Sequence, residues 1–66
     1  MTKRQSEVLK YIKDYCDTNG YSPSIRDICA GLDIKSTAQI AGILKSLREQ
    51  GKITYIERRA RTIEVL

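Results

Sequence analysis

Three residue pairs along the 66-residue chain carry the signature of a helix N-terminus, and they limit where its helices can begin. In each pair a Ser or Thr is followed three positions later by Gln or Asp, so that unpaired backbone N–H groups gain side-chain acceptors. The pairs are Thr2 with Gln5, Ser24 with Asp27, and Ser36 with Gln39. The spacing therefore predicts three helices joined by two short connections.

Each predicted helix also has an end signal. Gly20 ends the first helix and Gly51 the third, because glycine readily adopts the left-handed conformation that follows a last turn. Asp33 takes this role after the second helix, since aspartate tolerates that conformation better than most residues. The third helix therefore runs over 36–50, after a short second helix over 25–31 and a turn over 32–35. Apolar stripes at helical spacing are predicted to form the core: Val8, Leu9, Ile12, Tyr15 and Cys16; Ile25, Ile28, Cys29 and Leu32; Ile40, Ile43, Leu44 and Leu47.

Two short β-prone stretches, 52–56 and 62–66, finish the chain, and their apolar residues alternate with polar ones. Between them "ERRAR" at 57–61 predicts a hairpin loop that carries Arg58, Arg59 and Arg61. The order helix, helix, helix, hairpin predicts a mainly α fold with a small β-hairpin. This is a winged helix-turn-helix, occupying residues 1–66 as one domain.

Composition excludes several classes of function. Histidine is absent, so Ser–His and Cys–His catalysis is excluded, and no Gly-rich phosphate loop is present. The two cysteines, Cys16 and Cys29, lack the spacing of a metal site and are expected to be reduced, buried apolar residues. We expect no enzyme activity, no cofactor and no metal. We also expect a cytoplasmic protein, since neither a signal segment nor a membrane-spanning run is present.

The charge distribution points to a polyanionic partner. The net charge is +4, and the segment from Lys45 to Leu66 holds six basic and three acidic residues. Such a bias suits nucleic acid, although a solubilising surface is the alternative.

The third predicted helix keeps its outward face small. At about 100° per residue, Ile43, Leu44 and Leu47 lie within roughly 60° of Ile40, while Ala38, Gly42 and Lys45 lie opposite. Glycine inside a helix costs about 1 kcal/mol relative to alanine, so Gly42 indicates a requirement for close approach. A recognition helix entering the major groove, about 12 Å wide, has that requirement. A protein-interaction module that docks a partner helix on the same surface is the alternative.

The segments "TKRQSEVLKYIKDYCDTNGYSPSIRDI", "KSTAQIAGILKSLREQGKI" and "RTIEVL" resemble the N-terminal DNA-binding domain of the LexA repressor family over essentially the whole chain. The resemblance implies a repressor of DNA-damage-response (SOS) genes that binds double-stranded operator half-sites. It also implies a monomeric domain here and a homodimer in a full-length parent, whose C-terminal domain carries a self-cleaving Ser–Lys dyad. Asp33 and Cys29 depart from the family pattern, which usually has glycine and alanine there. A stand-alone regulator from a phage or mobile element is a further alternative.

The predicted interface has two groups of residues. Base edges are assigned to Ser36, Ala38, Gln39, Ala41 and Gly42, and phosphates to Lys35, Thr37, Lys45, Arg58, Arg59 and Arg61. Gln39 is the only long polar side chain of the first group and suits adenine. The same side chain is also the second member of a predicted capping box, and the two roles conflict. The operator sequence does not follow from these residues.

Overall fold

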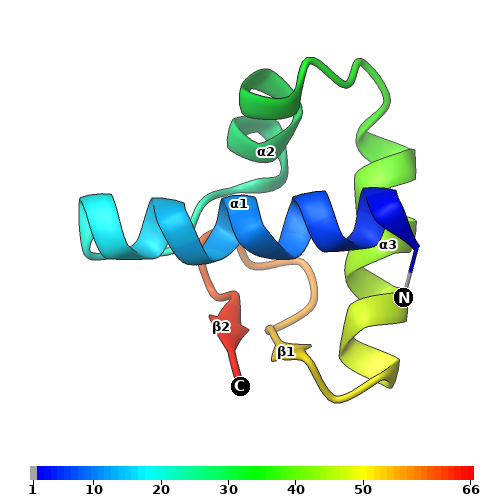
Figure 1. Ribbon diagram of the computed structural model, residues 1–66. Helices are drawn as coiled ribbons and strands as arrows, with labels where there is room; N and C mark the ends of the chain where they lie inside the picture. The colour runs from blue at the N-terminus through cyan, green and yellow to red at the C-terminus, as the bar shows by residue number, and fades with distance from the viewer. Residues whose placement is uncertain (1) are drawn as a thin grey trace.

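A computed structural model describes residues 2–66. Three helices are followed by two short strands, which confirms the predicted fold class of three helices and a hairpin (Figure 1). The elements are α1 (Lys3–Asn19), α2 (Ile25–Leu32), α3 (Thr37–Glu49), β1 (Ile53–Thr54) and β2 (Glu64–Val65).

The predicted caps determine the helix boundaries. Thr2 and Gln5 form a complete capping box before α1, and Ser24 and Asp27 form another before α2. Gly20 ends α1 in the left-handed region at φ 76°. Asp33 does the same after α2 at φ 55°, as predicted. The second helix is one residue longer than the predicted 25–31.

The three apolar stripes meet in one core, which confirms the helical phase of each. The buried hydrophobic residues are Val8, Ile12, Ile28, Ile34, Ile40, Leu44, Leu47, Ile53 and Ile63. Other members of the stripes, including Leu9, Ile25, Leu32 and Ile43, are half-buried at the edge of this core. Sequence reasoning missed Ile34, because this residue belongs to the turn and to no helical stripe.

The hairpin is much shorter than predicted. Only Ile53↔Val65 and Thr54↔Glu64 pair as antiparallel neighbours, whereas strands over 52–56 and 62–66 were expected. The predicted inward residues Ile53 and Ile63 are nevertheless buried. Thr62 explains the early end of pairing, because its hydroxyl, and not a backbone carbonyl, accepts the N–H of Ile56 at 2.9 Å. The connection from 55 to 63, hereafter the wing, is therefore a loop over most of its length.

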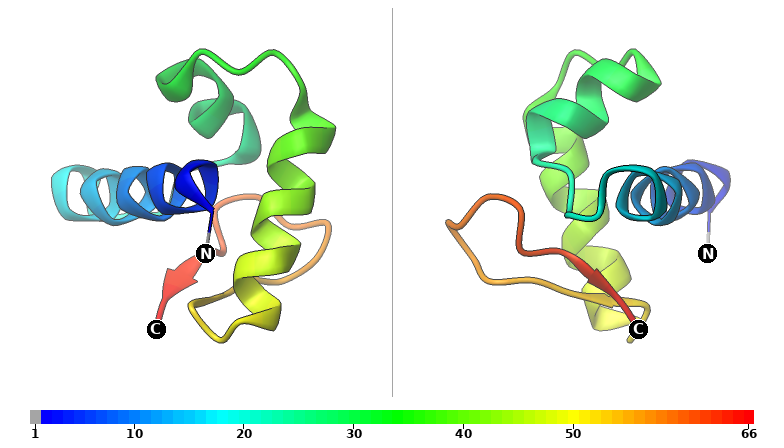
Figure 2. Two further views of the ribbon diagram at one scale, coloured as in Figure 1. Left: turned by 45° about the vertical axis from the view of Figure 1, so that its right-hand side comes forward. Right: turned by 90° about the vertical axis from the view of Figure 1, so that its left-hand side faces the viewer.

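The helices form a compact body from which the wing projects. α1 crosses α3 steeply, and α2 packs beside both (Figure 1). In the right-hand view of Figure 2 the wing extends from the side of α3 that faces away from α1. One face of α3 and the wing are thus left free of helical cover.

Both cysteines are free thiols, as predicted, but they are half-buried and lie at the edge of the core, where full burial was expected. Partial burial raises the pKa of the Cys16 thiol. Among residues 2–66, no helix is long and apolar enough to cross a membrane.

Candidate nucleic-acid interface

The turn between α2 and α3 is anchored to the core. Ile34 is buried, and its N–H donates to the Cys29 carbonyl at 2.9 Å. Ser36 then caps α3, its Oγ accepting the N–H of Gln39 at 3.1 Å. These contacts fix the start of α3 relative to α2, as a helix-turn-helix requires.

The outward face of α3 is exposed and carries small side chains. Ala38, Gln39, Ala41, Gly42 and Lys45 are all exposed, whereas Ile40, Leu44 and Leu47 on the opposite face are buried. A β-carbon built on Gly42 would meet no atom within 4 Å. Packing among residues 2–66 therefore does not require a glycine at position 42, and another molecule can approach the helix backbone closely here.

The predicted capping box of α3 is only half formed. Ser36 accepts from the Gln39 backbone, but the return bond from Ser36 N–H to the Gln39 side chain is absent, unlike at α1 and α2. The two complete boxes have N-cap ψ angles of 164° and 170°, whereas Ser36 has 110°. Since the backbone at Ser36 is oriented differently, the Gln39 amide is left free and exposed.

The N-terminus of α3 is electropositive. Its first turn contains no acidic residue, while Lys35 and Thr37 beside it are exposed. Unpaired backbone N–H groups and the helix dipole favour an anion at such an end. No ion pair within residues 2–66 involves Lys35 or Lys45.

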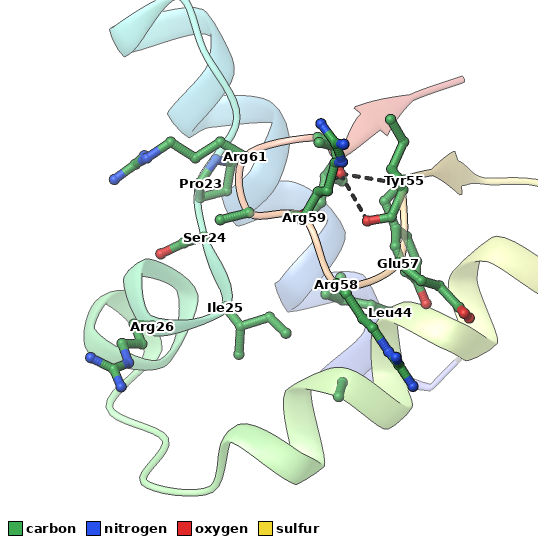
Figure 3. A pocket seen from close by; sticks show the side chains of 15 residues that line it. Pro23, Ser24, Ile25, Arg26, Leu44, Tyr55, Glu57, Arg58, Arg59 and Arg61 are labelled. Atoms are coloured by element: carbon green, nitrogen blue, oxygen red, sulfur yellow. Dashed lines mark hydrogen bonds between the residues drawn. The ribbon is translucent and has the colours of Figure 1, made fainter.

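The wing presents its arginines in different directions. Figure 3 shows the side chains of Arg58, Arg59 and Arg61 diverging from the loop. Arg58 and Arg59 are exposed and form no ion pair with any residue from 2 to 66. Thr62 closes the loop, because its hydroxyl also contacts the Arg59 carbonyl at 3.1 Å.

A hollow of about 400 Å³ separates the wing from the helices. Apolar side chains of Ile25, Leu44 and Tyr55 contribute to its lining, and Arg26 and Arg58 lie along it (Figure 3). Ala41 of α3 borders the same hollow. The wing and the outward face of α3 therefore flank one concave surface.

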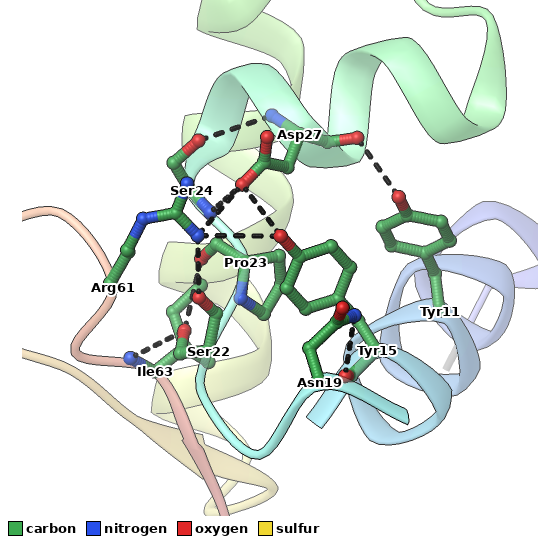
Figure 4. A network of polar contacts seen from close by, with 9 residues as sticks. All are labelled: Tyr11, Tyr15, Asn19, Ser22, Pro23, Ser24, Asp27, Arg61 and Ile63. Carbon is green, nitrogen blue, oxygen red and sulfur yellow. Dashed lines mark hydrogen bonds and ion pairs between the residues drawn. The ribbon is translucent and has the colours of Figure 1, made fainter. Parts of the chain in front are cut away.

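Arg61 is engaged within the fold. Its guanidinium pairs with the Asp27 carboxylate at 3.1 Å, donates to the Ser22 carbonyl at 3.2 Å and reaches the Tyr15 hydroxyl at 3.3 Å (Figure 4). It also lies 5.0 Å from the centroid of the Tyr21 ring. The ion pair distinguishes Arg61 from Arg58 and Arg59, although all three line the same hollow and 46% of the Arg61 side chain stays exposed. The Asp27 carboxylate attracts Arg61 to the base of α2.

The pKa values in this cluster reflect the same contacts. The backbone hydrogen bond from Ser24, with help from Arg61, lowers the pKa of Asp27. The hydrogen bond to Tyr15 raises the pKa of Arg61. The bond from Arg61 acts to lower the pKa of Tyr15, but Tyr21 and partial burial raise it overall. Asp27 and Arg61 are therefore both charged at neutral pH.

The chain matches known proteins over nearly its whole length. A sequence model described as the LexA DNA binding domain matches residues 1–62. The LexA repressor of Moorella thermoacetica is 44% identical over 59 residues, which is 89% of this chain and 29% of that protein. The LexA repressor of Staphylococcus aureus (strain USA300) is 39% identical over all 66 residues, 32% of its length. That of Clostridium novyi is 38% identical over 63 residues, 96% of this chain and 31% of that protein.

The chain belongs to the LexA DNA-binding domain family. It spans about a third of the length of these LexA repressors. Both expected departures from the LexA pattern fit the fold. Asp33 adopts the left-handed conformation in place of the usual glycine, and Cys29 is accommodated half-buried with its Sγ 3.9 Å from the Ser36 carbonyl.

The LexA-type fold brings most predicted residues together. The base-edge group, Ser36, Ala38, Gln39, Ala41 and Gly42, occupies one exposed face, with Lys35, Thr37 and Lys45 around it. Sequence reasoning missed Arg26, which is exposed and borders the hollow. Its position in the first turn of α2, two residues after the N-cap, was the available signal. Within residues 2–66 no group of three His, Cys, Asp or Glu side chains could hold a metal ion.

Proposed function

We propose that this chain binds double-stranded DNA sequence-specifically, as the DNA-binding part of a LexA-like transcriptional repressor. In this proposal α3 enters the major groove and the wing lies along the neighbouring backbone. The observation that carries the proposal is the open space over Gly42, on an exposed face of small side chains. A groove about 12 Å wide admits such a helix, and small residues let its backbone approach the base edges.

Base readout is assigned to Ser36, Ala38, Gln39, Ala41 and Gly42. Gln39 carries the most specific part, since a glutamine amide can bond both N6 and N7 of adenine. The half-formed cap supports this role, because the Gln39 side chain is not held by Ser36. Alanine side chains can contact a thymine methyl group.

Phosphate contacts are assigned to Lys35, Thr37, Lys45, Arg58 and Arg59, with Arg26 added. All are exposed, and none of the lysines or arginines among them takes part in an ion pair in the described chain. Such contacts fix the orientation of a protein on the duplex without reading its sequence. Arg61 is left out, because its Nη1 is held by Asp27, Ser22 and Tyr15 inside the fold.

The LexA relatives are named repressors, and we infer the same role for the protein to which this chain belongs. Its targets in this proposal are DNA-damage-response genes on the bacterial nucleoid, in the cytoplasm. Each copy of the domain binds one half-site as a monomer, and dimerisation in a full-length parent joins two copies. The chain itself has no catalytic role here. Self-cleavage would belong to another domain of the parent.

Selection of bound duplexes from a random pool tests the proposal. A sequence motif should emerge, and affinity for it should fall steeply with salt, because bound phosphates release counterions. If no duplex is enriched, the DNA proposal is wrong. The face of α3 would then dock a protein partner, and its affinity for that protein should hardly respond to salt.

A further inference from the structure

An arginine side chain anchors each end of the wing. At its N-terminal end, Arg48 of α3 pairs with Glu57 at 2.9 Å and lies 4.3 Å above the centroid of the Tyr55 ring. At its C-terminal end, Arg61 extends from the wing to Asp27 at the start of α2. The two anchors tie the wing to two different helices.

The β-pairing alone does not set the direction of the wing. Only two residue pairs join β1 and β2, and the loop beyond them spans residues 55–63. Two non-glycine residues of that loop, Arg58 and Arg61, adopt left-handed φ angles of 64° and 60°. Such conformations are unfavourable for side chains larger than glycine and persist where surrounding contacts hold them.

The second anchor is the more extensive. The Arg61 guanidinium contacts a carboxylate, a carbonyl and a hydroxyl, from Asp27, Ser22 and Tyr15 (Figure 4). Next to it, the N–H of Ile63 donates to the buried Ser22 Oγ at 3.1 Å. The base of the wing is thus fastened to the connector that leads into α2.

We infer that Arg61 is a positioning residue, which through Asp27 fixes the wing so that Arg58 and Arg59 meet the DNA backbone. The inference rests on the proposed function and deepens it. One nitrogen of the guanidinium, Nη1, makes all three contacts and ties the wing to α1, α2 and the connector between them. A loop that is fixed before binding loses less freedom when it meets its partner. Arg61 therefore acts on DNA affinity through its neighbours in the wing.

Asp27→Asn tests the inference, because a pure net-charge effect and a positioning role of Arg61 predict changes in DNA affinity of opposite sign. Removing a negative charge should strengthen binding to a polyanion if only net charge matters. If Asp27 holds the wing through Arg61, binding should instead weaken by roughly tenfold, as for the loss of one charge-assisted hydrogen bond. Asp17→Asn, at an exposed position near the end of α1, is the matched control with the same change of charge. Tighter or unchanged binding by Asp27→Asn would overturn the inference.

The effect of Arg61→Gln in two backgrounds then separates positioning from direct contact. Arg61→Gln should weaken binding in the wild-type background but have little further effect when Arg58 and Arg59 are both already glutamine. An equal loss in both backgrounds would mean that Arg61 contacts phosphate itself, and would overturn the inference. Thermal unfolding of each variant by circular dichroism confirms that it is folded at the temperature of the binding assay.

A measurement without DNA keeps the inference separate from the proposed function. In the free chain, Arg61→Gln should increase the nanosecond mobility of backbone amides 57–62, seen as lower NMR order parameters, and leave those of α3 unchanged. Arg59→Gln is the control, since Arg59 forms no ion pair in the described chain. Wing amides of unchanged order would refute the positioning role, whether or not the chain binds DNA.

Discussion

Gly31 of α2 lies directly against the phenol ring of Tyr11 of α1, and a β-carbon at Gly31 would overlap that ring. The part of the ring that faces Gly31 is also held in place, because the Tyr11 hydroxyl donates to the Asp27 carbonyl at 3.1 Å. The contact between the first two helices thus depends on the absence of a side chain. Sequence reasoning gave Gly31 no role.

Gly31→Ala should therefore destabilise the fold. Overpacking of this kind costs about 1–3 kcal/mol, which exceeds the gain of up to about 1 kcal/mol from replacing a helical glycine by alanine. Gly42→Ala is the matched control and should stabilise by up to about 1 kcal/mol, since nothing lies within 4 Å of the added carbon. Urea unfolding of both variants measures the difference. Equal shifts would show that Tyr11 can move aside freely.

Gly42→Glu should abolish specific DNA binding while the chain stays folded. The added side chain would project from the exposed face of α3 into open space, so the core is not disturbed. On DNA the same side chain would bring a negative charge towards the groove. Binding titrations and thermal unfolding test the two halves of this prediction, and Gly42→Gln separates the effect of charge from that of size. Unfolding of Gly42→Glu would contradict the exposed position of residue 42.

Replacing both Arg58 and Arg59 by alanine should weaken binding to every duplex by a similar factor. If each contacts one phosphate, the plot of log affinity against log salt should become shallower by about 1.8, from about 0.9 per contact. Salt titrations on matched and mismatched duplexes measure this slope. Lys10→Ala on α1, also exposed, is a charge control that should leave the slope almost unchanged. A full slope in the double variant would show that the wing does not touch DNA.

Gln39→Ala should change which base is preferred and leave the salt slope intact. The lost interaction would be a bidentate bond to one base, worth about 1–3 kcal/mol of discrimination. The cap of α3 should survive, because Ser36 Oγ accepts from the backbone N–H of Gln39. Selection of preferred duplexes with the wild-type and variant chains is the measurement. An unchanged base preference would show that the Gln39 side chain does not read a base.

Acid should weaken the fold partly through Asp27. The backbone hydrogen bond from Ser24 and the contact with Arg61 lower the pKa of Asp27 in the folded chain below its unfolded value of about 3.9. The stabilisation is therefore complete above that value and is lost as pH falls through the folded pKa. Free energies of unfolding measured between about pH 2 and 6 should fall less steeply on acidification for Asp27→Asn than for the wild-type chain. Parallel curves would rule out this linkage.

The features predicted correctly from the sequence are those set by interactions between residues close together in the chain. Capping pairs, end signals and apolar stripes lie within a few residues of the turns they control, so all three helices were predicted to within about one residue at each end. The outward face of α3 followed from the same periodicity. The half-formed cap at Ser36 could not be predicted in this way. The ψ angle of Ser36 depends on the turn before it, and that angle decides whether the capping box is complete.

What escaped prediction depends on contacts between residues far apart in the chain. Arg61 looked like one of three equivalent cations until the fold placed Asp27 beside it. Strand lengths likewise depend on the Thr62 hydroxyl, which takes the place of a ladder acceptor. No periodicity or composition within the wing carries that information.

The buried and the exposed residues of α3 lie on opposite sides of the helix. Ile40, Leu44 and Leu47 build the core, whereas Ala38, Gln39 and Ala41 are exposed to solvent. Mutation can therefore alter the second set with little effect on stability, since exposed substitutions usually change it by less than about 0.5 kcal/mol. Under the proposed function such a helix is evolvable: a lineage can change from one operator sequence to another through intermediates that all remain folded.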